Sequence, residues 1–381
     1  MPAEGDGLAE ARRPRRVAFV LAGLALLVVA VLAALLIPRS SSVAPAAGDY
    51  LFGIANSAPL DAADLKKMRV ARVSSVRFLF AWSAIEHRRG GSYDWIATDR
   101  IVGQLASHGI QPVPFVYGSP SWISRDLAGP PLANPSDRAA WTAFLKAAVN
   151  RYGPDGSYWA DNYERQFGGD VKPVPIAAWQ IWNEPNLPHY FASKSPPAAY
   201  TQLLRLSHDA IVKQDPGAEI VLAGMPGYGK PDTAWQFLDN LYRQPGFAGA
   251  FDAVALHPYA RTVAQLRLEI EKLRATMADH GDGDTPLWLT ELGWGSGKPN
   301  RFGLNKGLEG QRRLLEQSFQ LILDRRQDWH VQRLLWFDWR DPPPGAPQPC
   351  SFCSSAGLLE HSGFPKPSWI AYRQFASGGR R

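Results

Sequence analysis

Eight short apolar runs, separated by longer segments with helical periodicity, constrain the fold of this chain more than any other feature. The runs lie at residues 50–55, 73–79, 111–117, 176–182, 219–224, 252–257, 286–290 and 333–338. They lack a clean period of two, as expected for parallel strands that are buried on both faces. Strand–helix alternation repeated in this way predicts an α/β fold, namely a (β/α)8 TIM barrel.

The segments between the runs carry apolar residues at the spacing of amphipathic helices. Val263, Leu266, Ile270, Leu273 and Met277 recur at intervals of three and four residues, which indicates one buried helical stripe. Similar stripes predict helices after Pro135, around Leu315–Ile322 and over Pro367–Phe375. Two three-layer halves are the alternative architecture, but no Gly-x-Gly-x-x-Gly follows the first run, which argues against a dinucleotide-binding fold.

Composition excludes several classes of protein. Apolar residues make up 45% of the 381-residue chain and charged residues 20%, so a large core can be buried and disorder throughout is excluded. The net charge of +6 is spread without the basic stripe that a nucleic-acid partner would need. The chain has 14 tryptophans, which is a high number for its length, and exposed aromatic rings often pack on flat apolar faces such as those of sugars.

The N-terminus predicts a membrane anchor. Residues 17–37 are 21 consecutive residues without a charge or a proline, long enough to cross a bilayer, and Arg12–Arg16 just before them places the N-terminus in the cytoplasm. We therefore expect a basic cytoplasmic segment (1–16), a single transmembrane anchor (17–37), a linker (38–49) and an extracytoplasmic domain (50–381). A cleaved signal peptide, which would make the protein secreted, and a buried core helix are the alternatives.

Cys350 and Cys353 are the only two cysteines and stand in a Pro-rich loop. Outside the membrane, this Cys-Ser-Phe-Cys spacing predicts a local disulfide that pins the loop. A redox-active pair or half of a metal site is the alternative, but no second cysteine pair or His-x-x-His completes a metal site. A scaffold of several disulfides or a multi-cysteine zinc module is excluded by the count.

In a barrel of this kind, the chemistry lies where the strands end, at the C-terminal edge of the sheet. The residues at these ends are Asn56, Arg77, Tyr117, Asn183, Glu184, His257, Tyr259, Glu291 and the segment 336–341. Glu184 ends the fourth run and Glu291 the seventh, so their carboxyl groups are expected to face each other across the mouth.

Two opposed carboxyl groups are what glycosidic-bond cleavage requires. One protonates the leaving oxygen, and the other attacks the anomeric carbon or activates a water molecule. A separation of about 5–5.5 Å favours retention of configuration and about 6.5–9.5 Å favours inversion. Arg77 is expected to keep one carboxylate ionised, and Tyr259 to fix its orientation. The alternative is that these residues have only structural roles. Glu184 and Glu291 would then be structural or surface acids and Asn183 a turn residue. His257 would be a structural histidine, Tyr259 a core residue and Arg77 part of an ion pair.

Trp182-Asn183-Glu184-Pro185 is similar to the Asn-Glu-Pro signature at the end of strand four in glycoside hydrolase clan A. His257-Pro258-Tyr259 and Thr290-Glu291 resemble the ends of strands six and seven in the same clan. The extended form Trp-Asn-Glu-Pro-Asn most resembles family 39, with family 5 as the near alternative.

This resemblance implies a retaining glycosidase. It makes Glu184 the acid/base and Glu291 the nucleophile, with Asn183 holding the sugar 2-hydroxyl. Arg77 and Tyr259 would position Glu291, and His257 would line the central subsite. No metal or nucleotide cofactor is required, because both carboxyl groups act directly.

The sugar platform is the point where the sequence departs from the clan. The clan often places one tryptophan at the end of strand eight, whereas this chain offers three rings between residues 336 and 339. The candidate platforms along the chain are Trp82, Trp122, Tyr190, Trp294, Trp336 and Trp339.

Two other functions fit a barrel with these strand ends. A glycan-binding barrel without activity usually lacks one carboxylate, whereas both are present here. A phosphosugar lyase or aldolase would use the Gly-rich segment 293–298 for phosphate but would also need a Schiff-base lysine at a strand end, and none is found. We therefore expect a membrane-anchored glycosidase that acts on a surface polysaccharide or oligosaccharide.

Overall fold

The computed structural model describes residues 51–228, 231–300 and 303–378. They belong to the larger of the two compact units into which the chain divides, residues 45–381. The expected anchor at 17–37 lies outside the described residues, as do the expected cytoplasmic segment and the whole of the expected linker. Within the ranges given above, no helix has both the length and the apolar character needed to cross a bilayer.

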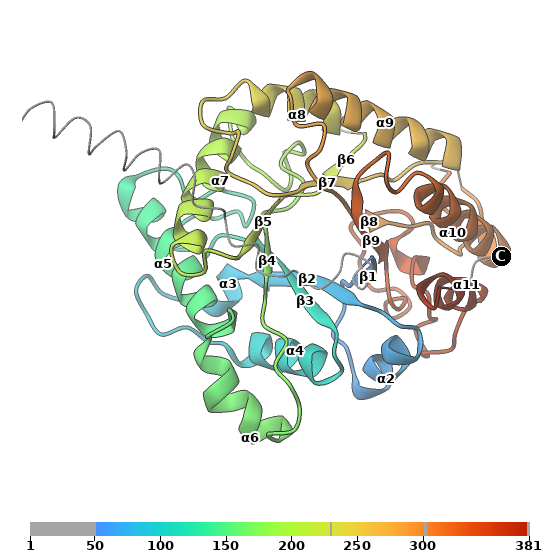
Figure 1. The fold of residues 1–381 in the computed structure, drawn as a ribbon, viewed down its shortest axis with the longest axis horizontal. Helices are drawn as coiled ribbons and strands as arrows, with labels where there is room; N and C mark the ends of the chain where they lie inside the picture. Colours follow the sequence, from blue (N-terminus) through green and yellow to red (C-terminus); the bar gives the residue numbers. More distant parts are fainter. Residues whose placement is uncertain (1–50, 229–230, 301–302, 379–381) are drawn as a thin grey trace, which may run out of the picture. The chain divides into compact units, whose positions relative to one another are not determined.

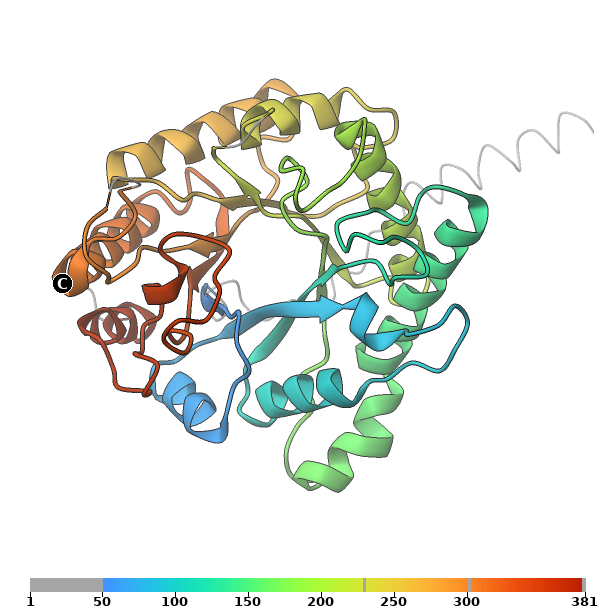
Figure 2. The same cartoon turned by 180° about the vertical axis from the view of Figure 1, so that it is seen from behind.

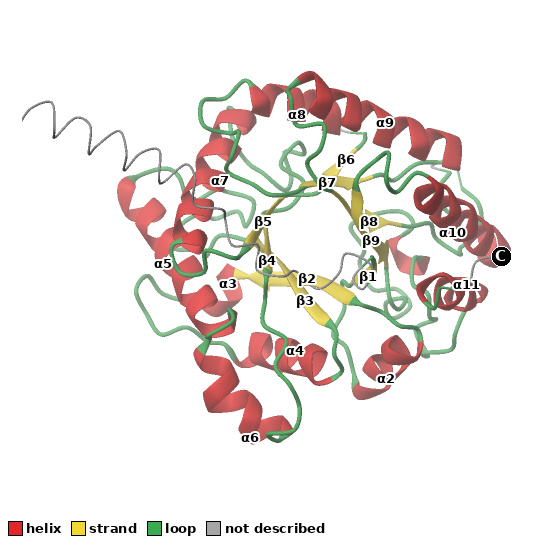
Figure 3. Cartoon of the chain, viewed as in Figure 1, coloured by secondary structure: helices red, strands yellow, loops and turns green. Residues whose placement is uncertain are grey.

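A parallel sheet lies at the centre of this unit (Figures 1 and 3). Its strands run in the order β5-β4-β3-β2-β1-β9-β8-β7-β6. They are β1 (Phe52–Ala55), β2 (Ser75–Ala81), β3 (Gln111–Tyr117), β4 (Ala178–Ile181), β5 (Glu219–Leu222), β6 (Met225–Pro226), β7 (Val254–His257), β8 (Leu287–Leu292) and β9 (Val331–Phe337). All eight apolar runs of the sequence form strands, and the fifth run with the residues after it supplies both β5 and β6.

The sheet curls until its two ends meet. Val221 of β5 forms a parallel bridge with Ala253 just before β7, and the Leu222 N–H donates to the Ala253 carbonyl at 3.0 Å. β6 continues the path of β5 and pairs with β7. The predicted α/β fold is therefore confirmed as a TIM-like barrel.

Helices surround the strands on the outside, as both views of the ribbon show (Figures 1 and 2). They are α2 (Ala62–Val70), α3 (Trp82–Ile85), α4 (Ile96–Ser107), α5 (Pro135–Tyr152), α6 (Glu164–Phe167), α7 (Pro196–Val212), α8 (Ala234–Tyr242), α9 (Val263–Asp279), α10 (Gly307–Asp324) and α11 (Pro367–Ala376), with a π-turn at Trp159–Tyr163 and a 3-10 turn at Cys353–Ser355. The four helices expected from apolar stripes are α5, α9, α10 and α11.

Local sequence explains where these helices begin. The Thr262 side chain accepts from the Gln265 N–H and caps α9, whose buried residues Leu266, Ile270, Leu273 and Met277 are those of the predicted stripe. The Asn134 side chain caps α5 by accepting from the Asp137 N–H, and Pro135 takes the first turn, where its missing N–H costs nothing.

A small apolar cluster fills the interior of the barrel on the N-terminal side of the strand ends. It consists of Val113, Ala178, Val221, Ala253, Ala255 and Trp288. Successive side chains of a strand alternate between faces, so the next inward position lies two residues further along each strand. On each strand, the residue two positions after a member of this apolar cluster (the apolar plug) is therefore the first that can contribute to a site at the C-terminal mouth of the barrel.

Candidate active site

A polar layer lies directly above the apolar plug. Gln180 follows Ala178 by two positions, His257 follows Ala255, and Thr290 follows Trp288. All three are fully buried. Gln180 Nε2 donates to the Leu222 carbonyl at 2.9 Å and to Thr290 Oγ1 at 3.3 Å, which ties β4, β5 and β8 together beneath the carboxyl groups of Glu184 and Glu291.

Arg77 of β2 links this layer to the mouth. Its Nε donates to Gln180, one terminal nitrogen donates to Asn183 Oδ1 at 2.7 Å, and the other contacts Glu291 Oε1 at 2.6 Å. The guanidinium also stacks over the Phe115 ring at 4.0 Å. Gln180 was missed by the sequence analysis, although a polar residue inside an apolar run was a visible signal.

The turn after β4 brings Glu184 into the mouth by an unusual backbone path. Trp182 has φ +73° and Glu184 has φ +42°, values in the left-handed region that residues other than glycine rarely adopt. Each such residue costs about 1–3 kcal/mol, so the surrounding structure must hold it in place. The Trp182 N–H donates to the Val116 carbonyl and the Glu184 N–H to the Gly224 carbonyl.

The Trp182 side chain supplies much of this support. It is fully buried, and its indole N–H donates to the Tyr190 carbonyl at 2.7 Å. Its ring packs edge-on against Tyr117, Trp141 and Phe191. The indole therefore acts as a structural anchor for the strained turn, which places the largely buried carboxyl group of Glu184 against His257.

Glu291, on β8, is held by a cation and a hydroxyl group. Arg77 pairs with Oε1 at 2.6 Å, and the Tyr259 hydroxyl donates to Oε2 at 2.5 Å. Burial opposes ionisation of this carboxyl, but the attraction of His257 and Arg77 and the hydrogen bonds from Tyr259 and Arg77 outweigh it, so the pKa of Glu291 lies below its usual value. Glu291 is therefore ionised near neutral pH.

Glu184 and Glu291 lie close together on either side of His257. His257 Nδ1 is 2.7 Å from Glu184 Oε1 and 3.7 Å from Glu291 Oε2. One atom from each of the three side chains lies within 4.8 Å of the others, close enough to hold a cation as well. The predicted pair from opposite sides of the barrel thus meets in the structure, together with Arg77, Asn183, His257 and Tyr259.

The tryptophans proposed as sugar platforms are placed differently from expectation. Trp82, Trp294, Trp336 and Trp339 are fully buried, and each indole N–H has a protein acceptor. They pack between strands and helices, because neighbouring residues of a strand end alternate between the mouth and the surrounding core. No sugar ring can stack on them in this structure. Trp122 is partly exposed, but its indole donates to the Glu86 carbonyl and its ring lies under Arg89.

The exposed rings of the mouth are mostly tyrosines. Burial and the charge of Glu184 raise the pKa of Tyr117 and Tyr190, and the same two causes, with Glu291, raise the pKa of Tyr228 to about 12. Each hydroxyl therefore stays protonated beside the two carboxyl groups. At the end of β9, Phe337 is the partly exposed ring, and it packs edge-on against Tyr259.

Cys350 and Cys353 form a disulfide in the structure. It holds the loop that carries Phe352, whose ring lies 5.2 Å from the Tyr259 ring. Through this contact, the loop supports the tyrosine that donates to Glu291.

Comparison with known proteins places this site in a family. A family model described as the glycosyl hydrolase catalytic core matches residues 156–365, which include both carboxylates. The chain belongs to this glycosyl hydrolase family. A comparison of the sequence with curated proteins found no match.

Solved glycoside hydrolases share the fold of this glycosyl hydrolase core. A family 39 enzyme from Bacteroides cellulosilyticus has a TM-score of 0.64 and 18% identity, over 87% of this chain and 64% of the other. A β-xylosidase from Caulobacter crescentus has a TM-score of 0.60 and 18% identity, over 86% and 68%. A family 5 protein from Streptomyces cattleya, crystallised with Manβ1-4GlcNAc, has a TM-score of 0.63 and 17% identity, over 87% and 80%. The resemblance to clan A is thereby confirmed.

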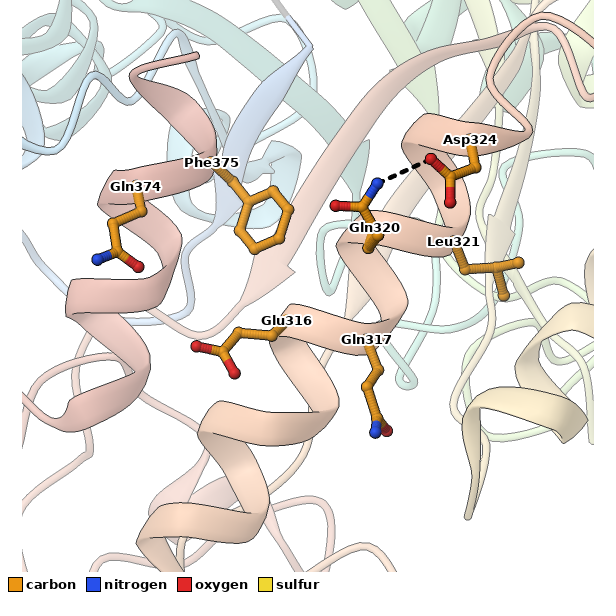
Figure 4. Close-up of a pocket in the computed structure, with 7 residues that line it drawn as sticks. All are labelled: Glu316, Gln317, Gln320, Leu321, Asp324, Gln374 and Phe375. Carbon is orange, nitrogen blue, oxygen red and sulfur yellow. Dashed lines mark hydrogen bonds between the residues drawn. The ribbon is translucent and has the colours of Figure 1, made fainter. Parts of the chain in front are cut away.

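The glycosyl hydrolase core also has a groove on its outer surface, between α10 and α11 (Figure 4). It measures about 440 Å³ and is lined by Glu316, Gln317, Gln320, Leu321, Asp324, Gln374 and Phe375. None of these residues belongs to the polar layer or contacts Glu184 or Glu291, so this groove is separate from the candidate active site.

Asp338, the residue directly after β9, is a buried acid of the glycosyl hydrolase core. It is 2% exposed and accepts from the Trp339 N–H at 2.6 Å and from Ser57. Burial dominates over these hydrogen bonds and raises the pKa of Asp338 to about 7, and the charge of Glu291 adds to the rise. The native state therefore keeps this proton up to near-neutral pH.

We expect Asp338→Asn to change how stability depends on pH. Between about pH 4 and 7 the unfolded chain loses the Asp338 proton and the native state retains it, so this residue lowers the free energy of unfolding as pH rises. The amide keeps the shape and removes the titration. Urea unfolding should show the variant gaining about 3 kcal/mol relative to wild type between pH 4.5 and 7.5. Parallel pH profiles for the two proteins would contradict the prediction.

Proposed function

We propose that this chain hydrolyses O-glycosidic bonds of an oligosaccharide or polysaccharide by double displacement, with retention of configuration. Glu291 is the nucleophile and Glu184 the general acid/base. The single observation that carries this proposal is the meeting of the two carboxyl groups, with atoms within 4.8 Å, at the mouth of a barrel of the glycosyl hydrolase family.

The distance between the carboxyl groups supports retention over inversion. An inverting enzyme needs about 6.5–9.5 Å between the two carboxyl groups to accommodate a water molecule, whereas a retaining enzyme needs about 5–5.5 Å. An oxygen of Glu184 and an oxygen of Glu291 lie within 4.8 Å of each other, which supports the closer, retaining arrangement.

The surroundings of each acid support the assignment of roles. Arg77 and Tyr259 hold Glu291 ionised and oriented, as attack on the anomeric carbon requires. Glu184 has no arginine partner among the described residues and contacts His257, and we assign to it the transfer of a proton to the leaving oxygen. In the second step, Glu184 takes a proton from the water that releases the sugar from Glu291. Asn183 stands beside Glu184 and would hold the sugar 2-hydroxyl.

The identity of the sugar can be sought among the substrates of structural neighbours. One neighbour is a β-xylosidase and another was crystallised with Manβ1-4GlcNAc. We therefore propose to begin with aryl β-xylosides and β-mannosides, followed by surface and plant polysaccharides.

Reducing-end release by the full chain from this panel tests the proposal, beside a Glu291→Gln control. Release that the control lacks would establish a hydrolase, and the polymer that responds would name the sugar class. If wild type and control release nothing and bind the same glycan equally, the protein is a binding module and the proposed hydrolysis is wrong.

Tyr259→Phe tests how Glu291 is held. Removing the hydroxyl removes a hydrogen bond that lowers the pKa of Glu291, so the acid limb of the kcat/KM profile should move to higher pH. Loss of the donor should also lower kcat by about 10–100-fold. The profile is measured from pH 3 to 8, with Tyr93→Phe as the control. An unchanged acid limb would show that Tyr259 does not tune the nucleophile.

We also propose that the domain is extracytoplasmic and anchored by residues 17–37, as their composition predicts. Proteolysis of intact cells followed by detection of a C-terminal tag tests this. Loss of the tag with retention of a cytosolic marker is expected for an anchored extracytoplasmic domain. A tagged protein found in the medium would indicate a cleaved signal peptide instead.

A further inference from the structure

A pocket of about 440 Å³ opens beside the nucleophile, and neither the reaction nor the family assignment explains it. Tyr259, Tyr228, Phe352, Arg261 and Gln265 contribute to its lining. Tyr259 belongs both to this pocket and to the Glu291 site, so the pocket begins where the catalytic centre ends. Its volume lies in the range of small-molecule sites.

The pocket offers ring faces suitable for a sugar. Tyr228 is 51% exposed, and it is close enough to Glu184 and Glu291 for their charges to raise its pKa. Phe352 lies on the disulfide-closed loop and packs against Tyr259. These are amphipathic and apolar rings of the kind on which sugars stack.

Arg261, which lines the pocket, and its neighbours Lys306 and Arg313 carry positive charge that the described part of the chain does not neutralise. No carboxylate of the described residues lies within 4.0 Å of the Arg261 guanidinium, the Lys306 ammonium or the Arg313 guanidinium. Partial burial, together with the charges of Arg261 and Arg313, lowers the pKa of Lys306, so the three cations are near enough to repel one another. An anion bound among them would relieve this repulsion.

Arg261 is held in place at its backbone. Its N–H donates to Gln265 Oε1 at 3.1 Å, and its carbonyl accepts from Lys306 Nζ at 2.8 Å. The preceding carbonyl, of Ala260, accepts the indole N–H of Trp294 at 2.7 Å. The stem of Arg261 lies over Gly303, where an added Cβ would come within 3.2 Å of it. These contacts fix the Arg261 backbone beside the pocket, and its exposed side chain contributes to the pocket lining.

We propose that this pocket is a subsite for a sugar unit that carries an anionic substituent, a carboxylate or a sulfate, and that Arg261 is the residue that selects it. This inference rests on the proposed function for its setting, since the subsite would hold a sugar next to the bond that is cleaved. The planar guanidinium binds either group through paired N–H donors, and Tyr228 and Phe352 contact the ring.

Equilibrium binding tests the subsite separately from hydrolysis. The full chain with Glu291→Gln is titrated calorimetrically with three matched pairs of oligosaccharides. Glucuronoxylan and hyaluronan fragments are each compared with their carboxyl-reduced forms, and carrageenan fragments with their desulfated forms. The titrations are repeated after adding Arg261→Ala, and after adding Arg267→Ala, which removes an exposed arginine of α9 that does not line the pocket.

At least one acidic fragment should bind about tenfold or more tightly than its neutral partner, since hydrogen bonds to charged groups are worth this much. Arg261→Ala should abolish most of that preference, and Arg267→Ala should leave it. A preference confined to the carboxyl pairs or to the sulfate pair identifies the substituent. No preference in any pair, or equal losses for the two arginine variants, overturns the inference. Failure of hydrolysis appears separately, as equal reducing-end release by wild type and Glu291→Gln.

Discussion

Glu291→Ala should lower kcat by about 10⁴-fold or more, and sodium azide should restore part of the lost activity. The variant lacks the carboxylate that forms the covalent intermediate, so the first bond cannot be made. It also creates space beside Arg77 where a small anion can enter and attack the anomeric carbon directly. Initial rates on a dinitrophenyl glycoside of the responsive sugar, with and without azide, measure both effects.

The product of this rescue is as informative as its rate. Azide attacking from the position of Glu291 performs a single displacement, so the glycosyl azide should have the inverted anomeric configuration. Glu309→Ala, an exposed acid at the start of α10, is the matched control and should behave like wild type. A glycosyl azide of retained configuration from Glu291→Ala would show that another group is the nucleophile.

The strands and the catalytic pair could be predicted because both depend on signals local in the sequence. A buried parallel strand must be apolar along its length, so each strand could be recognised as an apolar run. Parallel strands also bring their C-terminal ends to one edge of the sheet. Glu291 follows the seventh run directly and Glu184 lies two residues after the fourth, so both could be placed at the mouth from the sequence.

The supporting residues could not be found in the same way. Gln180 contacts Arg77, from another strand, and Asp338 accepts from Ser57, whose position is far away in the sequence. Their roles depend on which strands are neighbours and on how deep each side chain lies in the barrel. The left-handed backbone at Trp182 likewise depends on the cage of rings around it, which no local pattern encodes.

The tryptophans show the opposite error. They were conspicuous in the sequence and were predicted to line the mouth, but most of them lie in the core. Trp294 and Trp336 lie close to strand ends, but a shift of one residue exchanges the mouth for the core. The chain uses these large rings to fix its backbone, as Trp294 does at Ala260, and exposes Tyr190, Tyr228 and Phe337 instead. Of the expected platforms, Tyr190 lies at the mouth.

Glu184→Ala should lower kcat/KM on the natural polysaccharide by about 10³–10⁴-fold, and by far less on a dinitrophenyl glycoside. The natural leaving group needs a proton from Glu184, whereas dinitrophenolate leaves without one. With the activated substrate, the glycosyl-enzyme on Glu291 should accumulate, because no base remains to activate water. A burst of dinitrophenolate followed by slow turnover measures this, and equal losses on both substrates would contradict the acid/base role.

Azide distinguishes the two carboxylates when the variants are compared side by side. In Glu184→Ala, azide attacks the glycosyl-enzyme on Glu291, so two displacements occur and the product should keep the configuration of the substrate. In Glu291→Ala, one displacement should invert it. The two acids lie within 4.8 Å and share His257, so loss of rate alone would not tell them apart. Opposite configurations of the two azides require that Glu291 attack the sugar and Glu184 transfer the proton, and the same configuration from both would contradict that division.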